Sequence, residues 1–279
     1  MAIVSISRGA NSRGREVAQK VASQLGCRCL AREDVIKDSG LTDIPEDEII
    51  QALDEPPSFL ERLLGGKDRY ITTARAALLG QLNEDNVVYH GYAGHYFLEN
   101  VTHALKVRVL AELPDRVALM VDRDGISRAE ARERVAKKDE ARRQWALRVY
   151  GVDPEDPSLY DIVLHVGKMG PDDVAEIVCN LATDDAFKPT PASRSDLTDW
   201  ALIASVEAVL IDMEIDLDSL DLHVQDGNVM VRLYEPRRTR AGSSSEFRAQ
   251  YLESLRQRLH DRTRLIPGLK AVHLEQAGD

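Results

Sequence analysis

A glycine-containing loop between a short apolar run and a helical pattern is the first feature of this chain that could do chemistry. The loop comprises Gly9, Ala10, Asn11, Ser12, Arg13, Gly14, Arg15 and Glu16. A strand, the spacing Gly-x-x-x-x-Gly, a basic residue and a helix form the context in which backbone N–H groups cradle a phosphate. The free amides and the dipole at the helix N-terminus also favour an anion. The sequence therefore predicts a phosphate-binding loop, with a plain strand-to-helix turn as the alternative.

Two positions distinguish this loop from the standard P-loop. Arg15 stands where lysine usually reaches the β- and γ-phosphates, and Glu16 stands where a hydroxyl usually helps to hold magnesium. A carboxylate that faced the phosphates without a cation would be costly. We therefore expect Glu16 to point outward, where it would complement the helix dipole.

Alternating strands and helices must position this loop. Strand-like apolar runs occupy residues 3–7, 28–30, 87–90, 107–111 and 162–166, and helical patterns occupy residues 15–25, 69–82, 114–123, 128–150 and 171–181. This alternation is typical of an α/β fold with a mostly parallel sheet covered by helices. Each crossover is long enough for a right-handed βαβ unit.

A segment rich in small polar residues and proline follows the last of these helices and predicts a domain boundary. We assign residues 1–185 to a first domain, 186–195 to a linker and 196–279 to a small second module. In the second module, a helix over 197–210, strands over 220–224 and 229–233, a helix over 247–260 and a strand over 271–274 give the order αββαβ. The turn Asp226-Gly-Asn228 predicts that the first two strands form a hairpin.

Composition excludes several classes of function. The net charge of −11 argues against general nucleic-acid binding, although a local cationic pocket for a small phosphorylated ligand is compatible with it. No apolar run approaches the length of a membrane span. The three sparse cysteines and the absence of a secretory leader pattern favour a reducing, cytoplasmic compartment. His90 and His95 could form a metal pair, but their spacing across glycines favours packing at a strand end, and we predict no metal site in the protein itself.

Three ordered motifs give the first domain a family resemblance. The run Ile6-Ser-Arg-Gly-Ala-Asn-Ser-Arg-Gly-Arg-Glu-Val17 is similar to I-S-R-x-x-G-S-G-G-R-E-I. The segment 135–145 carries Asp139 and Arg142 in an Asp-x-x-Arg pattern, and Asp156-Pro-Ser-Leu-Tyr-Asp161 is similar to D-P-x-x-Y-D. Together these motifs make residues 3–182 resemble the cytidylate kinase-like family, a branch of the nucleoside monophosphate kinases.

The resemblance implies a P-loop kinase-type fold with a five-stranded parallel sheet and a lid. It also implies transfer of the ATP γ-phosphoryl group to a CMP-like nucleoside monophosphate or another small acceptor, with Mg²⁺ as the expected companion of ATP. Phosphoryl transfer depends on positioning and charge neutralisation. The resemblance assigns Arg15 to the donor phosphates, Arg142 with Arg143 to the lid, Arg116 to the nucleotide, and Asp139 to the orientation of Arg142. The competing interpretation of helix 128–150 is a solvated, charged surface.

Two positions do not match the family. Ala31 stands where the family often carries an acidic residue, and Tyr92 stands where it usually carries an arginine. These differences favour, as the alternative function, a catalytically impaired nucleotide sensor or scaffold that acts through the second module. The segment Ile266-Pro-Gly-Leu-Lys-Ala-Val272 resembles the end of a BON-type domain, a binding module, so residues 196–279 are expected to bind a protein or a small ligand.

Overall fold

The structure, a computed structural model, describes residues 3–39, 67–83, 86–91, 93–234 and 245–276. Its first part contains a five-stranded parallel sheet of order β2-β3-β1-β4-β5. The strands are β1 (Ile3–Arg8), β2 (Arg28–Ala31), β3 (Val87–His90), β4 (Ala104–Ala111) and β5 (Ile162–Val166). Because all five run the same way, their carboxyl ends meet at one edge, where open α/β sheets bind ligands.

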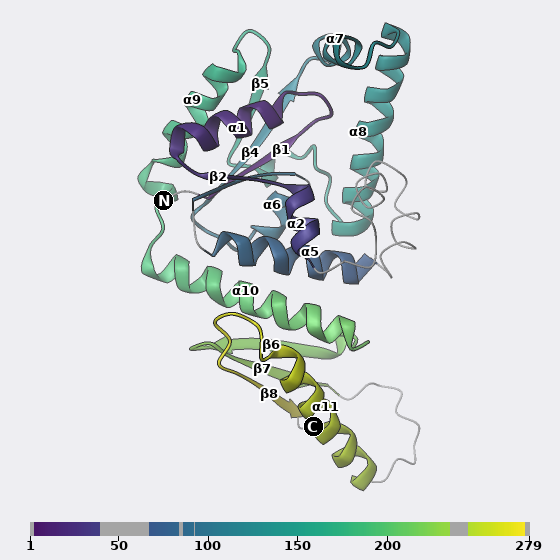
Figure 1. Cartoon of the computed structure of the whole chain (residues 1–279), viewed down its shortest axis with the longest axis vertical. Helices are drawn as coiled ribbons and strands as arrows, with labels where there is room; N and C mark the ends of the chain where they lie inside the picture. Colours follow the sequence, from purple (N-terminus) through teal and green to yellow (C-terminus); the bar gives the residue numbers. More distant parts are fainter. Residues whose placement is uncertain (1–2, 40–66, 84–85, 92, 235–244, 277–279) are drawn as a thin grey trace.

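Helices cover both faces of this sheet (Figure 1). The helices of this part of the chain are α1 (Gly14–Leu25), α2 (Arg32–Asp38), α5 (Lys67–Leu82), α6 (Gly94–Phe97), α7 (Leu113–Asp124), α8 (Arg128–Tyr150) and α9 (Pro171–Ala182). On one face, α1 and α9 pack against Val4 and Ile6 of β1. On the other, α5 and α6 pack against Ile3 and Tyr89. The alternation of side chains along β1 thus supplies both cores.

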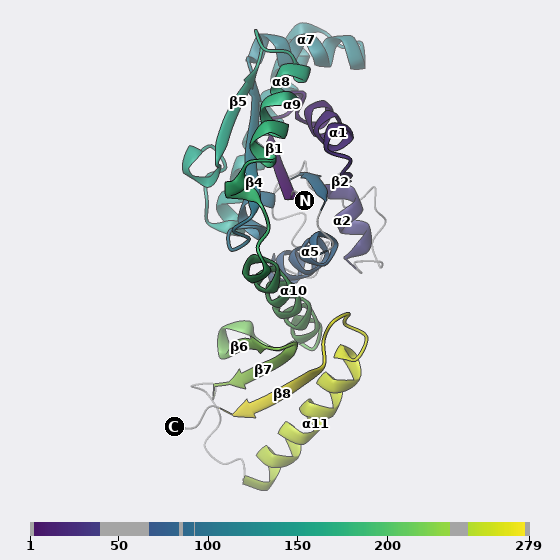
Figure 2. The ribbon, with the colours of Figure 1, turned by 90° about the vertical axis from the view of Figure 1, so that its left-hand side faces the viewer.

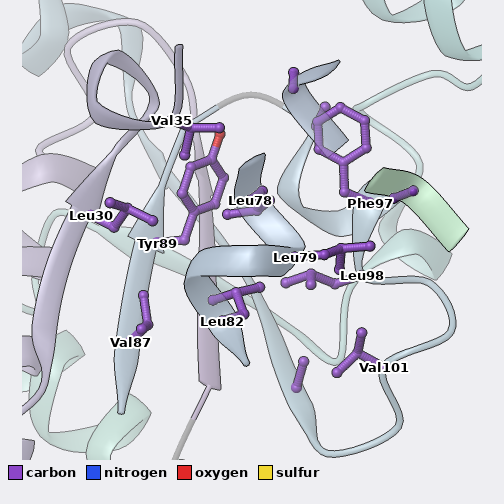
Figure 3. Packing of buried hydrophobic residues seen from close by; sticks show 14 of the residues in the cluster. Leu30, Val35, Leu78, Leu79, Leu82, Val87, Tyr89, Phe97, Leu98 and Val101 are labelled. Atoms are coloured by element: carbon purple, nitrogen blue, oxygen red, sulfur yellow. The ribbon is translucent and has the colours of Figure 1, made fainter. Parts of the chain in front are cut away.

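The core on the α5 side is built from large aliphatic and aromatic side chains (Figure 3). Leu78 and Leu82 of α5 are fully buried against the sheet, and Tyr89 of β3 lies beside Leu30 and Leu78. Phe97 and Leu98, at the end of α6, join the same cluster. This packing fixes the position of α6 beyond the carboxyl end of β3.

The helix α10 (Pro191–Asp212) belongs to two cores at once. Leu197, Ala201 and Ala204 pack into the core on the α5 side, whereas Leu202 and Val206 pack into the core of the second module. In both views α10 lies between α5 and the small sheet (Figures 1 and 2). The helix α10 therefore packs against both parts of the chain and contributes side chains to both cores.

The start of α10 lies inside the segment expected to be a linker. The side chain of Thr190 accepts a hydrogen bond of 3.0 Å from the Ser193 backbone N–H, which caps the helix. Pro191 occupies the first helical position, where its missing N–H costs nothing. The residues that suggested a linker are thus helix-start residues, and the division into two domains at 186–195 stays a prediction.

Two ion pairs link α10 to α5. Arg69 Nε lies 3.0 Å from Asp212 Oδ1, and Arg75 pairs with Glu207. Burial raises the pKa of Glu207, against the opposing effect of the Arg75 guanidinium. Because breaking a partly buried pair leaves a charge without compensation, these contacts fix how the two helices align.

The second module has the expected αββαβ order. After α10 come β6 (Leu220–Gln225), β7 (Asn228–Leu233), α11 (Ser245–Thr263) and β8 (Ala271–Gln276), in a sheet of order β6-β7-β8. The strands β6 and β7 are antiparallel, and β7 and β8 are parallel. Asp226 and Gly227, with φ of 51° and 78°, form the predicted hairpin turn.

The α/β fold class is confirmed, with small differences at the ends of elements. The predicted ranges of α8, β3 and β5 match the structure, whereas β4 begins at Ala104, three residues before the predicted Val107. The added residues pair with Ile3, Val4 and Ser5 of β1. Among the described helices, none combines the length and the apolar composition needed to cross a bilayer.

Candidate nucleotide site

The loop predicted to bind phosphate lies between β1 and α1, as the sequence indicated. Ser12 Oγ donates a hydrogen bond to the Gly9 carbonyl oxygen at 3.1 Å, which holds the loop in a tight turn. Asn11 and Arg13 adopt positive φ angles of 56° and 62°. A Cβ atom at Gly14 would lie 2.6 Å from Arg8 Cβ, so only glycine allows α1 to start this close to β1.

The positive φ angles fall where the family motif has glycine. In the alignment of the first motif, Asn11 and Arg13 occupy the first and second glycines of G-S-G-G. The left-handed conformation costs an ordinary residue roughly 1–2 kcal/mol, and asparagine tolerates it better than most. The loop of this chain therefore holds its shape against local strain at Arg13.

Arg13→Gly is expected to raise the free energy of unfolding. Relief of the left-handed strain should exceed the added chain entropy of glycine and the lost exposed Arg13–Glu16 pair, for a net gain of about 0.5–1 kcal/mol. Urea unfolding followed by circular dichroism measures the change. Asn11→Gly is the matched control and should have a smaller effect, and a loss of stability in Arg13→Gly would contradict the strain argument.

Beside the loop, arginines from four elements converge on one pocket. The pocket is lined by Arg8 of β1, Arg108 of β4, Arg116 of α7, and Arg142 and Arg143 of α8. Two acidic residues, Asp139 and Glu155, also line it, so positive charge predominates in a chain whose net charge is −11. The positive electrostatic potential in such a pocket attracts small anions.

Asp139 connects α8 to the loop between β1 and α1. Its Oδ1 accepts a hydrogen bond of 3.0 Å from the Ala10 N–H, and its other oxygen pairs with Arg116. Arg116 Nε in turn donates to the Ala10 carbonyl oxygen at 2.7 Å. The hairpin of α7 and α8 makes this arrangement possible, because Val117 and Val135 pack together in its own small core.

The structure brings five of the residues predicted for the site together in one pocket. Gly9, Arg116, Asp139, Arg142 and Arg143 all line the pocket. The oxygens of Asp139 contact Arg116 and Ala10. The orientation of Arg142 by Asp139 stays a prediction. Arg143 is held by Asp153 at 2.7 Å, a pairing that the sequence did not indicate.

Arg15 and Glu16 lie at the first turn of α1, outside this pocket. Arg15 is exposed there. Glu16 Oε2 accepts a bond of 3.0 Å from Arg13 Nε at the surface, an arrangement that agrees with the outward orientation expected for this carboxylate. Ala31 ends β2 and donates its N–H to Asp34 at 2.7 Å, and Tyr92 lies outside the described residues.

Sequence reasoning missed several residues of the pocket. Arg8 stands inside the first motif but received no role, and it lines the pocket from the end of β1. Arg108 donates to Tyr160 Oη at 3.1 Å and lies over the tyrosine ring. His95, in α6, was interpreted as packing, yet it also lines the pocket. A charged residue within an otherwise apolar strand was the only signal for Arg108.

The loop and the pocket suit the phosphates of a nucleotide. Within the described part of the chain, Arg8 Nε and Asn11 Nδ2 are buried donors without a hydrogen-bond partner. Phosphate oxygens are the acceptors that guanidinium and amide donors prefer at such a loop. Among the described residues, no three acidic, histidine or cysteine side chains are grouped to hold a metal ion.

Comparisons with known proteins agree with this geometry. The chain is 35% identical over 113 residues to a cytidylate kinase of Thermococcus kodakarensis. The aligned region covers 40% of this chain and 56% of that protein. It thus spans about half the length of that relative. A cytidylate kinase of Ignicoccus hospitalis is 28% identical over 184 residues, 64% of this chain and 97% of its own length.

The same fold occurs in a solved structure, and a family model covers most of the first part of the chain. An uncharacterized protein from Eubacterium ventriosum superposes with a TM-score of 0.52 at 17% identity, over 65% of this chain and 97% of that one. The model of the cytidylate kinase-like family matches residues 3–168. The match ends before α10, so the BON-type resemblance of residues 196–279 stays a prediction. Residues 3–168 place this chain in the cytidylate kinase-like family.

Proposed function

We propose that the chain transfers the γ-phosphoryl group of ATP to a CMP-like nucleoside monophosphate. The observation that carries the proposal is the meeting of the phosphate loop with arginines of β1, β4, α7 and α8 in one pocket. Family membership and the cytidylate kinases among the relatives support it. A cytoplasmic location is part of the proposal, because ATP is the donor.

In the proposed reaction, ATP would supply the phosphoryl group, and Mg²⁺ bound with the ATP would neutralise negative charge on its phosphate oxygens. The bond between the γ-phosphorus and the β–γ bridging oxygen breaks, and a phosphate oxygen of the acceptor forms the new bond, giving ADP and a nucleoside diphosphate. The acceptor phosphate is already largely ionised at neutral pH, so the protein needs no general base. Arginines that hold both phosphates in line supply the catalysis.

The residues of this chain divide between the two nucleotides. The loop from Gly9 to Arg15 and Arg116 would hold the donor phosphates. Arg142 and Arg143, on the lid helix, would neutralise charge between donor and acceptor. Asp139 would keep Arg116 and the loop in register, because it bonds to both.

A coupled ADP-release assay with MgATP and a panel of nucleoside monophosphates tests the proposal. We expect turnover with CMP or a related pyrimidine monophosphate, in excess of the ATPase rate without acceptor. Calorimetric titration of MgATP, run in parallel, measures donor binding alone. Binding of ATP without turnover on any acceptor would contradict the kinase proposal and support the nucleotide sensor instead.

A further inference from the structure

His95 is a buried histidine of the short helix α6, which follows β3 at the carboxyl edge of the sheet. Its exposed fraction is 7%, and it lines the arginine pocket. Its ring lies 5.0 Å from that of Tyr160, centroid to centroid, and Tyr160 also bonds to Arg108. The imidazole thus packs on one side against the ring of Tyr160, which the hydrogen bond from Arg108 holds in place.

Both ring nitrogens of His95 are buried, and neither has a hydrogen-bond partner within the described residues. Buried polar atoms in native proteins are nearly always bonded, so two such atoms on one side chain require an explanation. A pocket that receives a polar ligand provides one, because the ligand can supply the missing partners. The two ring nitrogens are therefore available to form hydrogen bonds with a ligand in the pocket.

The imidazole is neutral at physiological pH. Burial, and next the guanidinium of Arg108, lower the pKa of His95 to about 4. A neutral imidazole offers one N–H donor and one nitrogen acceptor and carries no charge that would attract phosphate. The phosphates would instead bind the nearby arginines, so the partner that suits His95 is an uncharged group with its own donors and acceptors.

The other residues that line the pocket suit the nucleoside, which is the uncharged part of a nucleotide. Alongside His95, the pocket is lined by apolar and aromatic groups, namely Ala93, Leu110, Trp145, Ala146 and Tyr150. A nucleoside presents flat apolar faces together with hydrogen-bonding edges, whereas a phosphate presents neither. Pockets for such ligands typically combine apolar walls with a few placed polar groups.

We propose that His95 binds the uncharged nucleoside part of the phosphoryl acceptor and helps to determine which acceptor is used. This inference rests on the proposed kinase function. The base edge and the sugar hydroxyls share the required chemistry, since both can donate and accept hydrogen bonds. Neither the family motifs nor the charge pattern of the sequence assigns this role to position 95.

Steady-state kinetics of His95→Leu and His95→Gln test the proposal with CMP, UMP, AMP and GMP as acceptors and ribose 5-phosphate as a probe without a base. We expect His95→Leu to raise the acceptor KM at least tenfold, with kcat changed less than threefold and the KM for ATP less than twofold. His95→Gln retains a neutral donor and acceptor and should recover part of the acceptor affinity. His165→Leu, at an exposed position of β5 beside Glu112, is the matched control and should change none of these constants.

The outcomes distinguish the role of His95 from the kinase function. If the wild-type chain turns over an acceptor and His95→Leu leaves the KM of every acceptor unchanged, the role of His95 is wrong and the kinase function stands. If the wild-type chain neither binds nor phosphorylates any nucleoside monophosphate, the kinase function fails and this inference fails with it. Altered KM values for the nucleotides alone would indicate contact with the base, and an equal change for ribose 5-phosphate would indicate contact with the sugar.

Discussion

Arg142→Ala is expected to lower the kcat of phosphoryl transfer by at least about a thousandfold, the range in which an arginine that neutralises a transferring phosphoryl group acts. Arg142 lies in the pocket on α8, three residues beyond Asp139, which bonds that helix to the loop between β1 and α1. Because the charge between donor and acceptor is greatest in the transition state, its loss should affect kcat more than either KM. The coupled ADP-release assay at saturating MgATP and acceptor measures this change.

Two further variants make the result specific to Arg142. Arg132→Ala removes an exposed arginine from the same helix, outside the pocket, and should leave kcat within twofold of the wild type. Arg142→Lys keeps the charge but loses the planar fork, so its activity should lie between those of the wild type and Arg142→Ala. Equal losses in Arg132→Ala and Arg142→Ala would indicate that helix charge in general, and not the pocket, supports turnover.

The sequence predicted the elements well where local signals agree with the fold. The range of α8 was predicted correctly because Ser127 accepts a bond from the Glu130 N–H at its start and Gly151, with φ of 72°, ends it. The start of α10 was missed because Thr190 and Pro191 are equally common in loops and at helix starts. Only the packing of α10 against two cores at once decides between these states.

The sequence motifs pointed to part of the pocket lining and to none of its contacts. The phosphate loop, Arg116 and Asp139 came from motifs, but the bond between Asp139 and Ala10 joins residues 129 positions apart. It depends on the packing of α7 against α8 and of both beside the sheet edge, which no local pattern reports. His95 and Arg108 share this limit, because neither belongs to one of the three motifs and only the fold places both at the pocket.

The stability of the fold is expected to fall between pH 7 and pH 5 because two buried histidines must stay neutral. Burial, and next the charge of Arg8, lower the pKa of His90 from 6.5 to about 4. His95 falls to a similar value through its burial and Arg108. Between pH 6.5 and 4 the unfolded chain therefore binds more protons than the folded one, so the stability present above pH 6.5 is lost as the pH falls. The loss at pH 5 should be about 2 kcal/mol for each histidine.

Urea unfolding at pH 7 and pH 5 measures this loss, and replacement of the histidines separates it from other acid effects. Glutamine does not titrate, so His90→Gln and His95→Gln should each lower stability at pH 7 yet reduce the difference between the two pH values by about 2 kcal/mol. His165→Gln, at an exposed position, should leave that difference unchanged. Because His90 and His95 lie 3% and 7% exposed at the same sheet edge, their protonation would place positive charge beside Arg8 and Arg108. An unchanged difference in both glutamine variants would mean that neither histidine resists protonation in the folded state.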